Sequence, residues 1–291
     1  MSLFVRERSR AYRLKEHGTT LTEQHGRLHR PGALLEWGSI TKTVTAAIAH
    51  RLADANALNL SAPTTEYLPS SSLPESATVS SLIEHTSGLH RVPADMFTDP
   101  KDLVDPYARY TNEYFDAQVI PHLHENHNGA VGVYDYSNLG YAVLTRILET
   151  AAGRSWWDLA DELVLTPAGV TDATITPDPA HVPVLHTWTG RIRKQWTDVG
   201  PFIGAGGLVS TFDALEQYAH HVAQSHRAGE SLPGWQRTGQ LVWHNGHNRD
   251  HGAFVGFTPD LVVTVHTLGY RSGTGDRIAA RLLQDHAERQ R

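Results

Sequence analysis

Two residues of the chain, Ser39 and Lys42, could form the centre of an acyl-transfer site. Residues three apart lie on one face of a helix, so the two side chains can meet if a helix begins here. A hydroxyl is a weak nucleophile until a neighbouring base removes its proton, and a desolvated amine can be that base. Gly38 leaves room for a substrate near the backbone. The unpaired N–H groups at a helix start would stabilise negative charge beside Ser39.

The same spacing has an ordinary structural explanation, in which a serine caps a helix and a solvated lysine follows one turn later. The surroundings of Lys42 argue against that explanation. Lysine is rare in the chain, and this one enters a segment, 44–53, that is apolar nearly all round, as a buried helix would be. Burial and the positive end of the helix would disfavour the charged form of Lys42 and help it act as a base.

The composition limits the kinds of partner. The chain has 291 residues and a formal net charge of −6, which argues against nucleic acid or an anionic membrane surface. No apolar run is long enough to span a bilayer, and the absence of cysteine excludes disulfides and thiol catalysis. Residues 1–10 lack the apolar core of a secretory signal, so we expect a cytoplasmic protein acting on a small molecule. The oligomeric state is open.

Histidine is unusually frequent, with 19 residues, and several lie close together in the sequence. Such clusters raise the alternative of a zinc site. His122, His124 and His127, however, sit in a polar stretch without the spacing of a helical His-Glu-x-x-His motif. We therefore expect no metal and no cofactor, and a zinc-dependent hydrolase is the third choice of function.

The order of the predicted elements indicates an α+β fold. Strand patterns occur near both chain ends, at 3–6, 11–15, 184–188, 190–196, 240–243, 252–257 and 261–267, with a turn at Asn245-Gly246. Helix patterns occur at 39–55, 79–85, 139–152, from 155 to before Pro167, 212–225 and 275–288. We expect an antiparallel sheet built from both chain ends, flanked by helices, with a mainly helical insertion. The sheet region would be 1–62 plus 184–291 and the insertion 63–183, together one catalytic domain, 1–291.

Six short patterns, in order, resemble those of the serine β-lactamase and penicillin-binding-protein superfamily. The nearest branch is the class C β-lactamase-like group, with its esterases and D-amino-acid peptidases. The patterns are Trp37-Gly38-Ser39-Ile40-Thr41-Lys42; the stretch from Leu52 to Pro69; Leu82-Ile83-Glu84-His85-Thr86-Ser87-Gly88-Leu89; Tyr136-Ser137-Asn138-Leu139-Gly140-Tyr141; Thr166-Pro167-Ala168-Gly169-Val170-Thr171-Asp172; and Gly206-Gly207-Leu208-Val209-Ser210-Thr211.

The resemblance implies a role for each matching residue. Ser39 would be the nucleophile of an acyl-enzyme, Lys42 would help activate it, and Tyr136 would carry the proton between serine, water and leaving group. Asn138 would orient Lys42 and hydrogen-bond the substrate. From the sequence alone, Tyr136 could also be a core aromatic residue and Asn138 a helix N-cap.

The family's third motif departs most from the usual pattern. His244-Asn245-Gly246 fits it best, with His244 and Gly246 lining the site and the backbone N–H of His247 joining that of Ser39 as oxyanion donors. The family often has Lys-Thr-Gly here, and its lysine meets the carboxylate of β-lactams, so histidine makes β-lactam hydrolysis less favoured. The resemblance implies a serine esterase or amidase, by hydrolysis or acyl transfer. The alternative is a binding or regulatory protein that keeps the scaffold without activity.

Overall fold

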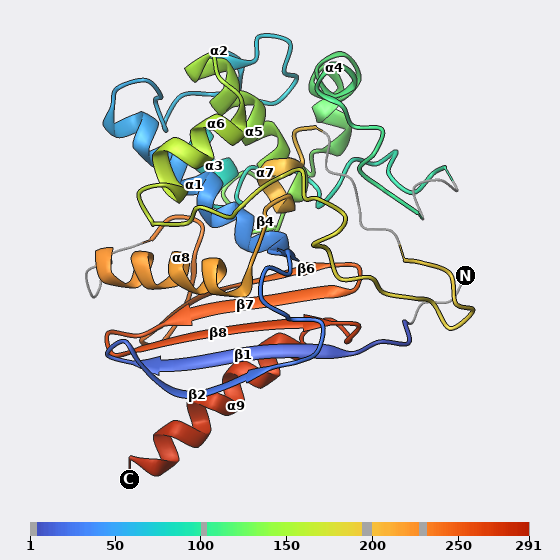
Figure 1. Ribbon diagram of the computed structural model, residues 1–291. Coiled ribbons are helices and arrows are strands. Elements are labelled where there is room, and N and C mark those ends of the chain that lie inside the picture. The colour runs from blue at the N-terminus through green and yellow to red at the C-terminus, as the bar shows by residue number, and fades with distance from the viewer. Residues whose placement is uncertain (1–4, 100–103, 194–199, 227–231, 291) are drawn as a thin grey trace. The chain divides into compact units, whose positions relative to one another are not determined.

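The computed structural model describes residues 5–99, 104–193, 200–226 and 232–290 (Figure 1). The chain divides into two compact units. The first comprises Met1–Ile40, Leu165–Lys194 and Leu208–Arg291, and the second comprises Thr41–Val164 and Gln195–Gly207. These bounds differ from the predicted sheet region and insertion, since the helix after Ser39 packs with other helices. A compact unit need not be an independent domain, so the predicted domain boundaries stay a prediction.

The first unit is built on a six-stranded antiparallel sheet in the order β2-β1-β8-β7-β6-β5. Its strands are β1 (Ser9–Glu16), β2 (Thr19–His25), β5 (Gln236–Thr238), β6 (Leu241–Asn248), β7 (His251–Phe257) and β8 (Leu261–Leu268). The two chain ends meet where β1 pairs with β8. Two short strands, β3 (Leu35–Glu36) and β4 (Val209–Ser210), pair separately. The predicted α+β fold with a sheet from both chain ends is confirmed.

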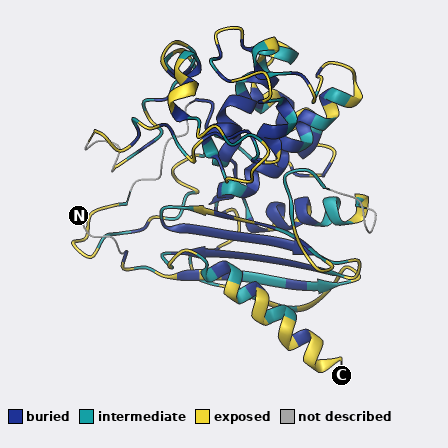
Figure 2. Cartoon of the chain, turned by 180° about the vertical axis from the view of Figure 1, so that it is seen from behind, coloured by how far each residue is buried: buried dark blue, intermediate teal, exposed yellow. Residues whose placement is uncertain are grey.

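Two helices, α8 (Phe212–Ser225) and α9 (Thr274–Arg289), cover opposite faces of this sheet (Figure 1). Successive side chains of a strand point to opposite faces of the sheet, so a strand can contribute side chains to an apolar cluster on each face. Ala11 of β1 packs in one cluster with Phe212 of α8, whereas Leu14 packs in the other with Ala279 of α9. With both faces covered, every residue of β7 is buried, as the dark central strands in Figure 2 show.

The second unit is mainly helical. Its helices are α1 (Thr41–Asp54), α2 (Thr64–Tyr67), α3 (Val79–Ile83), α4 (Asn112–Tyr114), α5 (Asn138–Ala152), α6 (Trp156–Ala160) and α7 (Ile203–Gly206). The long helices α1 and α5 are largely buried and pack on each other and on α7. A π-helical turn and a 3₁₀ segment, Phe115–Val119 and Ile120–Asn126, follow α4.

The predicted helix ends agree with the observed caps. The hydroxyls of Thr78, Ser155 and Thr211 each accept a hydrogen bond from the backbone N–H three residues on, which satisfies one of the unpaired donors of the first turn. Helix α5 ends at Gly153 in a left-handed conformation (φ 63°).

Local predictions were wrong in three regions of the chain. Residues 184–193 form no sheet strand, because the segment closes on itself in a tight loop held by Thr187 and Leu185, with isolated bridges only. Asn245-Gly246 is not a turn but the middle of β6, and the chain reverses at 249–250. Of the predicted strand 3–6, Val5 makes one isolated bridge. Residues 3–4 and 194–196 lie outside the described residues.

A partly buried ion-pair cluster joins α8 to β1. The carboxylate of Glu216, 4% exposed, accepts from the Arg13 guanidinium at 2.6 Å and from the Lys15 ammonium at 3.1 Å. Burial by itself would lower the pKa of Arg13, but the hydrogen bond and charge of Glu216 raise it well above its usual value. Arg13 also donates to the exposed carboxylate of Asp213 at 2.9 Å.

Replacing the buried carboxylate should therefore cost far more than replacing the exposed one. Glu216→Gln removes the buried charge that faces both Arg13 and Lys15 and should lower the free energy of unfolding by about 3 kcal/mol, although Arg13 keeps its ion pairs with Asp213 and Glu23. The control, Asp213→Asn, should change it by less than about 0.5 kcal/mol. Urea unfolding of both variants measures the difference, and equal losses would show that burial of Glu216 does not matter.

Candidate active site

The turn that carries Ser39 lies directly against the backbone of β6. Gly38 opens a 3₁₀ turn, Gly38–Ile40, with a positive φ of 53°, and a Cβ built on it would lie 2.6 Å from the backbone nitrogen of His247. A Cβ built on Gly246 would lie 1.8 Å from the carbonyl oxygen of Trp37 and 2.9 Å from the backbone nitrogen of Ser39. Only glycine at both positions permits this approach.

The approach brings together the two groups expected to form an oxyanion hole. The backbone nitrogens of Ser39 and His247 both lie at the contact between the turn and β6. Two N–H groups converging beside a nucleophile suit the negative oxygen of a tetrahedral intermediate. The structure thus places Ser39, Gly246 and His247 in one half of the predicted site, inside the first unit.

His244 lies on the same strand and is 3% exposed. Its Nδ1 donates to the carbonyl oxygen of Asn245 at 2.7 Å, which fixes the proton on that nitrogen. Trp37 is anchored nearby, since its indole N–H donates to the hydroxyl of Ser210 at 2.7 Å. A buried ring whose Nδ1 donor is used on the backbone has a structural role, in addition to any contact with substrate.

The second unit holds the other predicted catalytic residues. Lys42 is fully buried in α1, and its ammonium donates to the carbonyl oxygen of Ala205 at 2.6 Å. The same nitrogen lies 5.0 Å from the ring centroid of Tyr136 and 5.5 Å from that of Tyr141. A buried cation is costly unless it is paired or faces aromatic rings, so these contacts hold Lys42 beside Tyr136.

His85 positions Tyr136, a role that sequence reasoning missed. Its ring packs in a tilted arrangement on Tyr136, with centroids 4.5 Å apart, and on Tyr141, with centroids 5.0 Å apart. Its Nδ1 accepts from the backbone N–H of Ser137 at 3.0 Å, and its carbonyl accepts from Asp135 at 2.8 Å. His85 belongs to one of the motifs that carry the family resemblance. No pattern in the sequence, however, shows that its ring packs on Tyr136, 51 positions later.

Asn138 is the first residue of α5 rather than its cap. Ser137 is the N-cap, with its hydroxyl accepting from the N–H of Gly140 at 2.8 Å. The side-chain amide of Asn138 donates weakly to the hydroxyl of Tyr107 at 3.5 Å. Its buried Oδ1 has no hydrogen-bond partner among the described residues. A buried acceptor left over in this way is typical of a binding group.

Comparison with known proteins decides the family. The model of the β-lactamase family matches residues 13–288. The chain belongs to the β-lactamase family. Its predicted membership in the serine β-lactamase and penicillin-binding-protein superfamily is therefore confirmed.

Two curated relatives match part of this β-lactamase-family chain. Penicillin-binding protein 4 of Amycolatopsis lactamdurans is 29% identical over 154 residues, which are 51% of this chain and 38% of that protein. The D-alanyl-D-alanine-carboxypeptidase/endopeptidase AmpH of Escherichia coli K12 is 26% identical over 179 residues, 60% of this chain and 44% of that protein. The matches thus span less than half the length of either relative.

Solved structures show the same fold at low identity. A penicillin-binding protein homologue from Pyrococcus abyssi, described as octameric, has a TM-score of 0.77 and 20% identity, covering 94% of this chain and 72% of that one. A β-lactamase/D-alanine carboxypeptidase from Yersinia pestis, complexed with citrate, has a TM-score of 0.74 and 19% identity, covering 97% and 93%.

A chain of buried hydrogen bonds ends three residues before the nucleophile. Ser9 Oγ and His29 Nδ1 are 2.9 Å apart, His29 Nε2 and His266 Nδ1 3.0 Å, and His266 Nε2 and the carbonyl oxygen of Glu36 3.2 Å. Carbonyl oxygen only accepts, so His266 donates from Nε2 and accepts at Nδ1. His29 must then donate from Nε2 and accept from the Ser9 hydroxyl. All three hydrogen bonds can form together only while the imidazole rings of His29 and His266 are both neutral.

The environment keeps these rings neutral. Burial and neighbouring imidazoles lower the pKa of His29 to about 2 and those of His251 and His266 to about 3. His251 lies beside them, with its Nε2 3.7 Å from the carboxylate of Glu36. His251 and His266 lie on the paired strands β7 and β8, whereas His29 is more than 200 residues earlier and contacts His266 through a hydrogen bond, so no local pattern indicated the cluster.

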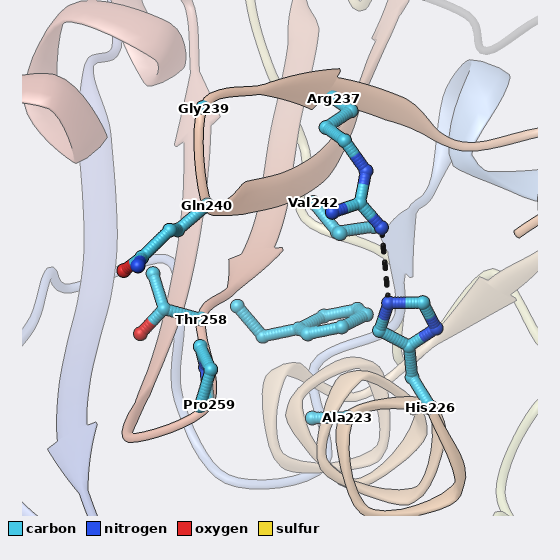
Figure 3. A pocket seen from close by; sticks show the side chains of 9 residues that line it. Ala223, His226, Arg237, Gly239, Gln240, Val242, Thr258 and Pro259 are labelled. Carbon is cyan, nitrogen blue, oxygen red and sulfur yellow. Dashed lines mark hydrogen bonds between the residues drawn. The ribbon is translucent and has the colours of Figure 1, made fainter. Parts of the chain in front are cut away.

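A pocket of about 300 Å³ lies elsewhere in the first unit (Figure 3). Arg237 donates to Nε2 of His226 at 3.2 Å on one side of it, and Val242 and Phe257 provide apolar lining. None of the predicted site residues lines this pocket, so we do not assign it to acyl transfer.

Two features that would indicate particular partners are absent from the residues that the structure describes. In this part of the chain, no group of three or more histidine, aspartate or glutamate side chains is arranged to hold a metal ion. Within the same residues, no helix has both the length and the apolar character that crossing a membrane requires.

The close approach at Gly246 gives a stability test. Gly246→Ala places a methyl group inside the backbone of the Ser39 turn and should cost about 3 kcal/mol or more of unfolding free energy. Gly275→Ala is the control, because its Cβ would meet nothing closer than 3.8 Å in helix α9. Urea unfolding should show a large loss for the first and none for the second. Equal stability of the two variants would contradict the described packing.

The buried histidines give a pH test. Each of these histidines binds a proton below about pH 6.5 in the unfolded chain but stays neutral in the folded protein. The free energy of unfolding therefore falls as the pH drops below that value, and each histidine contributes about 1.4 kcal/mol for every pH unit. His266→Gln removes one such group and keeps a donor for Glu36, so the pH slope between 6 and 5 should shrink by about that amount. The exposed His17→Gln should leave the slope unchanged; an unchanged slope in His266→Gln would contradict the account.

Proposed function

We propose that this protein is a serine hydrolase that forms an acyl-enzyme on Ser39 with a small ester or amide. The observation that carries the proposal is the pairing of Ser39 with the β6 backbone at Gly246 and His247. Membership in the β-lactamase family supports it. In the sequence, two residues separate Ser39 from Lys42, the spacing expected for a nucleophile and the group that activates it.

In the first step, the oxygen of Ser39 attacks the carbonyl carbon and its proton passes to Tyr136 in its phenolate form, which the neighbouring Lys42 ammonium favours. The N–H groups of Ser39 and His247 stabilise the oxyanion. When the intermediate collapses, Tyr136 gives a proton to the leaving oxygen or nitrogen, and the acyl group remains on Ser39. Water then attacks the acyl carbon and gives a proton to Tyr136. The bond from the acyl carbon to Ser39 Oγ breaks, the proton returns to Ser39, and the carboxylic acid product leaves.

The remaining site residues have supporting roles in this proposal. Asn138 would bind a substrate N–H through its buried Oδ1, and His244 would line the acyl site. The curated relatives are named as a penicillin-binding protein and a D-alanyl-D-alanine carboxypeptidase/endopeptidase, which supports amides as well as esters. Hydrolysis and transfer to another acceptor share every step up to the acyl-enzyme. The cytoplasmic location and the exclusion of nucleic acid and membrane as partners stay predictions.

Turnover of a panel of p-nitrophenyl esters, D-amino-acid amides and nitrocefin tests the assignments. Tyr136→Phe and Lys42→Met should each lower kcat by about a thousandfold, because the groups act as one unit. Lys42→Met keeps the buried stem, so the fold should survive. Tyr134→Phe, an exposed ring that also contacts His85, is the matched control and should keep wild-type kcat.

Near-wild-type kcat in Tyr136→Phe would show that the proton carrier is wrongly assigned. If the folded wild-type protein turned over no substrate, the alternative of a binding or regulatory protein would be favoured.

A further inference from the structure

An arginine outside the predicted site lies on the ring of its proposed proton carrier. The guanidinium carbon of Arg91 is 5.1 Å from the ring centroid of Tyr136, and the ammonium of Lys42 is 5.0 Å from the same centroid. Two cations therefore flank one phenol ring, in a protein whose net charge is −6. Such a local excess of positive charge attracts an anionic group.

The backbone holds Arg91 beside Asn138. The carbonyl oxygen of Arg91 accepts from the N–H groups of Asn138 and Leu139, at 2.9 and 3.2 Å, at the start of α5. The side chain of Arg91 is exposed, unlike that of Lys42. The backbone of Arg91 is thus held in place by hydrogen bonds, while its side chain is exposed to solvent.

Three other arginines of the second unit are bound to carboxylates, whereas Arg91, like Arg51, has no acidic partner among the described residues. Arg109 pairs with Asp95 at 3.2 Å, Arg146 with Asp116 at 2.7 Å, and Arg154 with Glu162 at 2.7 Å. The nearest acid in sequence to Tyr136, Asp135, accepts from Asn128 instead. The contact of Arg91 with Tyr136 is a cation–π contact, and the N–H donors of a guanidinium can bind a carboxylate in a two-pronged arrangement.

We propose that Arg91 binds a carboxylate of the substrate, and that the substrate class is esters or amides carrying such a group. The proposal rests on the proposed function. The buried Oδ1 of Asn138, without a partner among the described residues, supplies an acceptor for a substrate N–H at the neighbouring position. Arg91 is then a specificity residue: it selects the substrate and takes no part in proton transfer.

Two esters that differ only in charge test this specificity. We choose 4-nitrophenyl hydrogen glutarate, with a free carboxylate, and 4-nitrophenyl methyl glutarate, in which it is esterified. The wild-type protein should prefer the acid in kcat/KM by about tenfold or more, and the preference should fall as salt rises. Arg91→Gln should lower kcat/KM for the acid by about tenfold, through KM, and leave the methyl ester within about twofold. Arg91→Lys should restore part of the preference.

The matched control is Arg51→Gln, which removes an equally exposed positive charge from the end of α1. It should leave both esters unchanged. Equal ratios of acid to ester in the wild type and Arg91→Gln would overturn the proposal, as would the same loss in Arg51→Gln.

A binding measurement separates this proposal from the proposed function. Glutarate titrated into Ser39→Ala, followed by amide chemical shifts or calorimetry, should bind, and binding should be lost in the double variant with Arg91→Gln. Binding without turnover in the wild type would retain Arg91 as an anion site and reject the hydrolase. If the wild type turned over the methyl ester but Arg91→Gln did not change glutarate binding, the hydrolase would be retained and Arg91 would be rejected as an anion site.

Discussion

The close approach of the Ser39 turn to β6 is the constraint on which the candidate site depends. Without a side chain at Gly38 or Gly246, two backbone segments can touch, and the nitrogens of Ser39 and His247 lie at that contact. The antiparallel pairing of β6 with β7 makes the strand rigid, since residues through Asn248 are held in register. The buried hydrogen bonds from Ser9 to the carbonyl of Glu36 fix the chain just before the turn. The backbone therefore positions the two N–H groups that we propose as oxyanion donors.

The base of the proposed reaction is positioned by a different means. Lys42 is buried among the tyrosine rings and the carbonyl oxygen of Ala205, and His85 fixes the segment that carries Tyr136. These contacts all lie inside the helical unit. The covalent link from Ile40 to Thr41 joins them to the nucleophile, so the Ser-x-x-Lys spacing is what connects the two sets of groups.

The sequence predicted the elements whose signals are local. The helix starts at 79 and 212 and the helix end before 153 were predicted, because the capping residues Thr78, Thr211 and Gly153 lie beside them in the sequence. The turn predicted at Asn245-Gly246 was wrong, because the glycine serves a contact with a segment 200 residues earlier rather than a change of direction. The buried histidines and the packing of Arg91 on Tyr136 also depend on long-range pairing, which no single window of sequence contains. Motif resemblance identified the family, but it gave no distances.

The most direct test of the account is to trap the acyl-enzyme. The folded protein is treated with a fluorophosphonate probe, digested, and the adduct is located by mass spectrometry. The account predicts one adduct on Ser39, none in Ser39→Ala, and much slower labelling in Lys42→Met. No adduct on the folded wild-type protein, or equal labelling of Ser39→Ala, would contradict it.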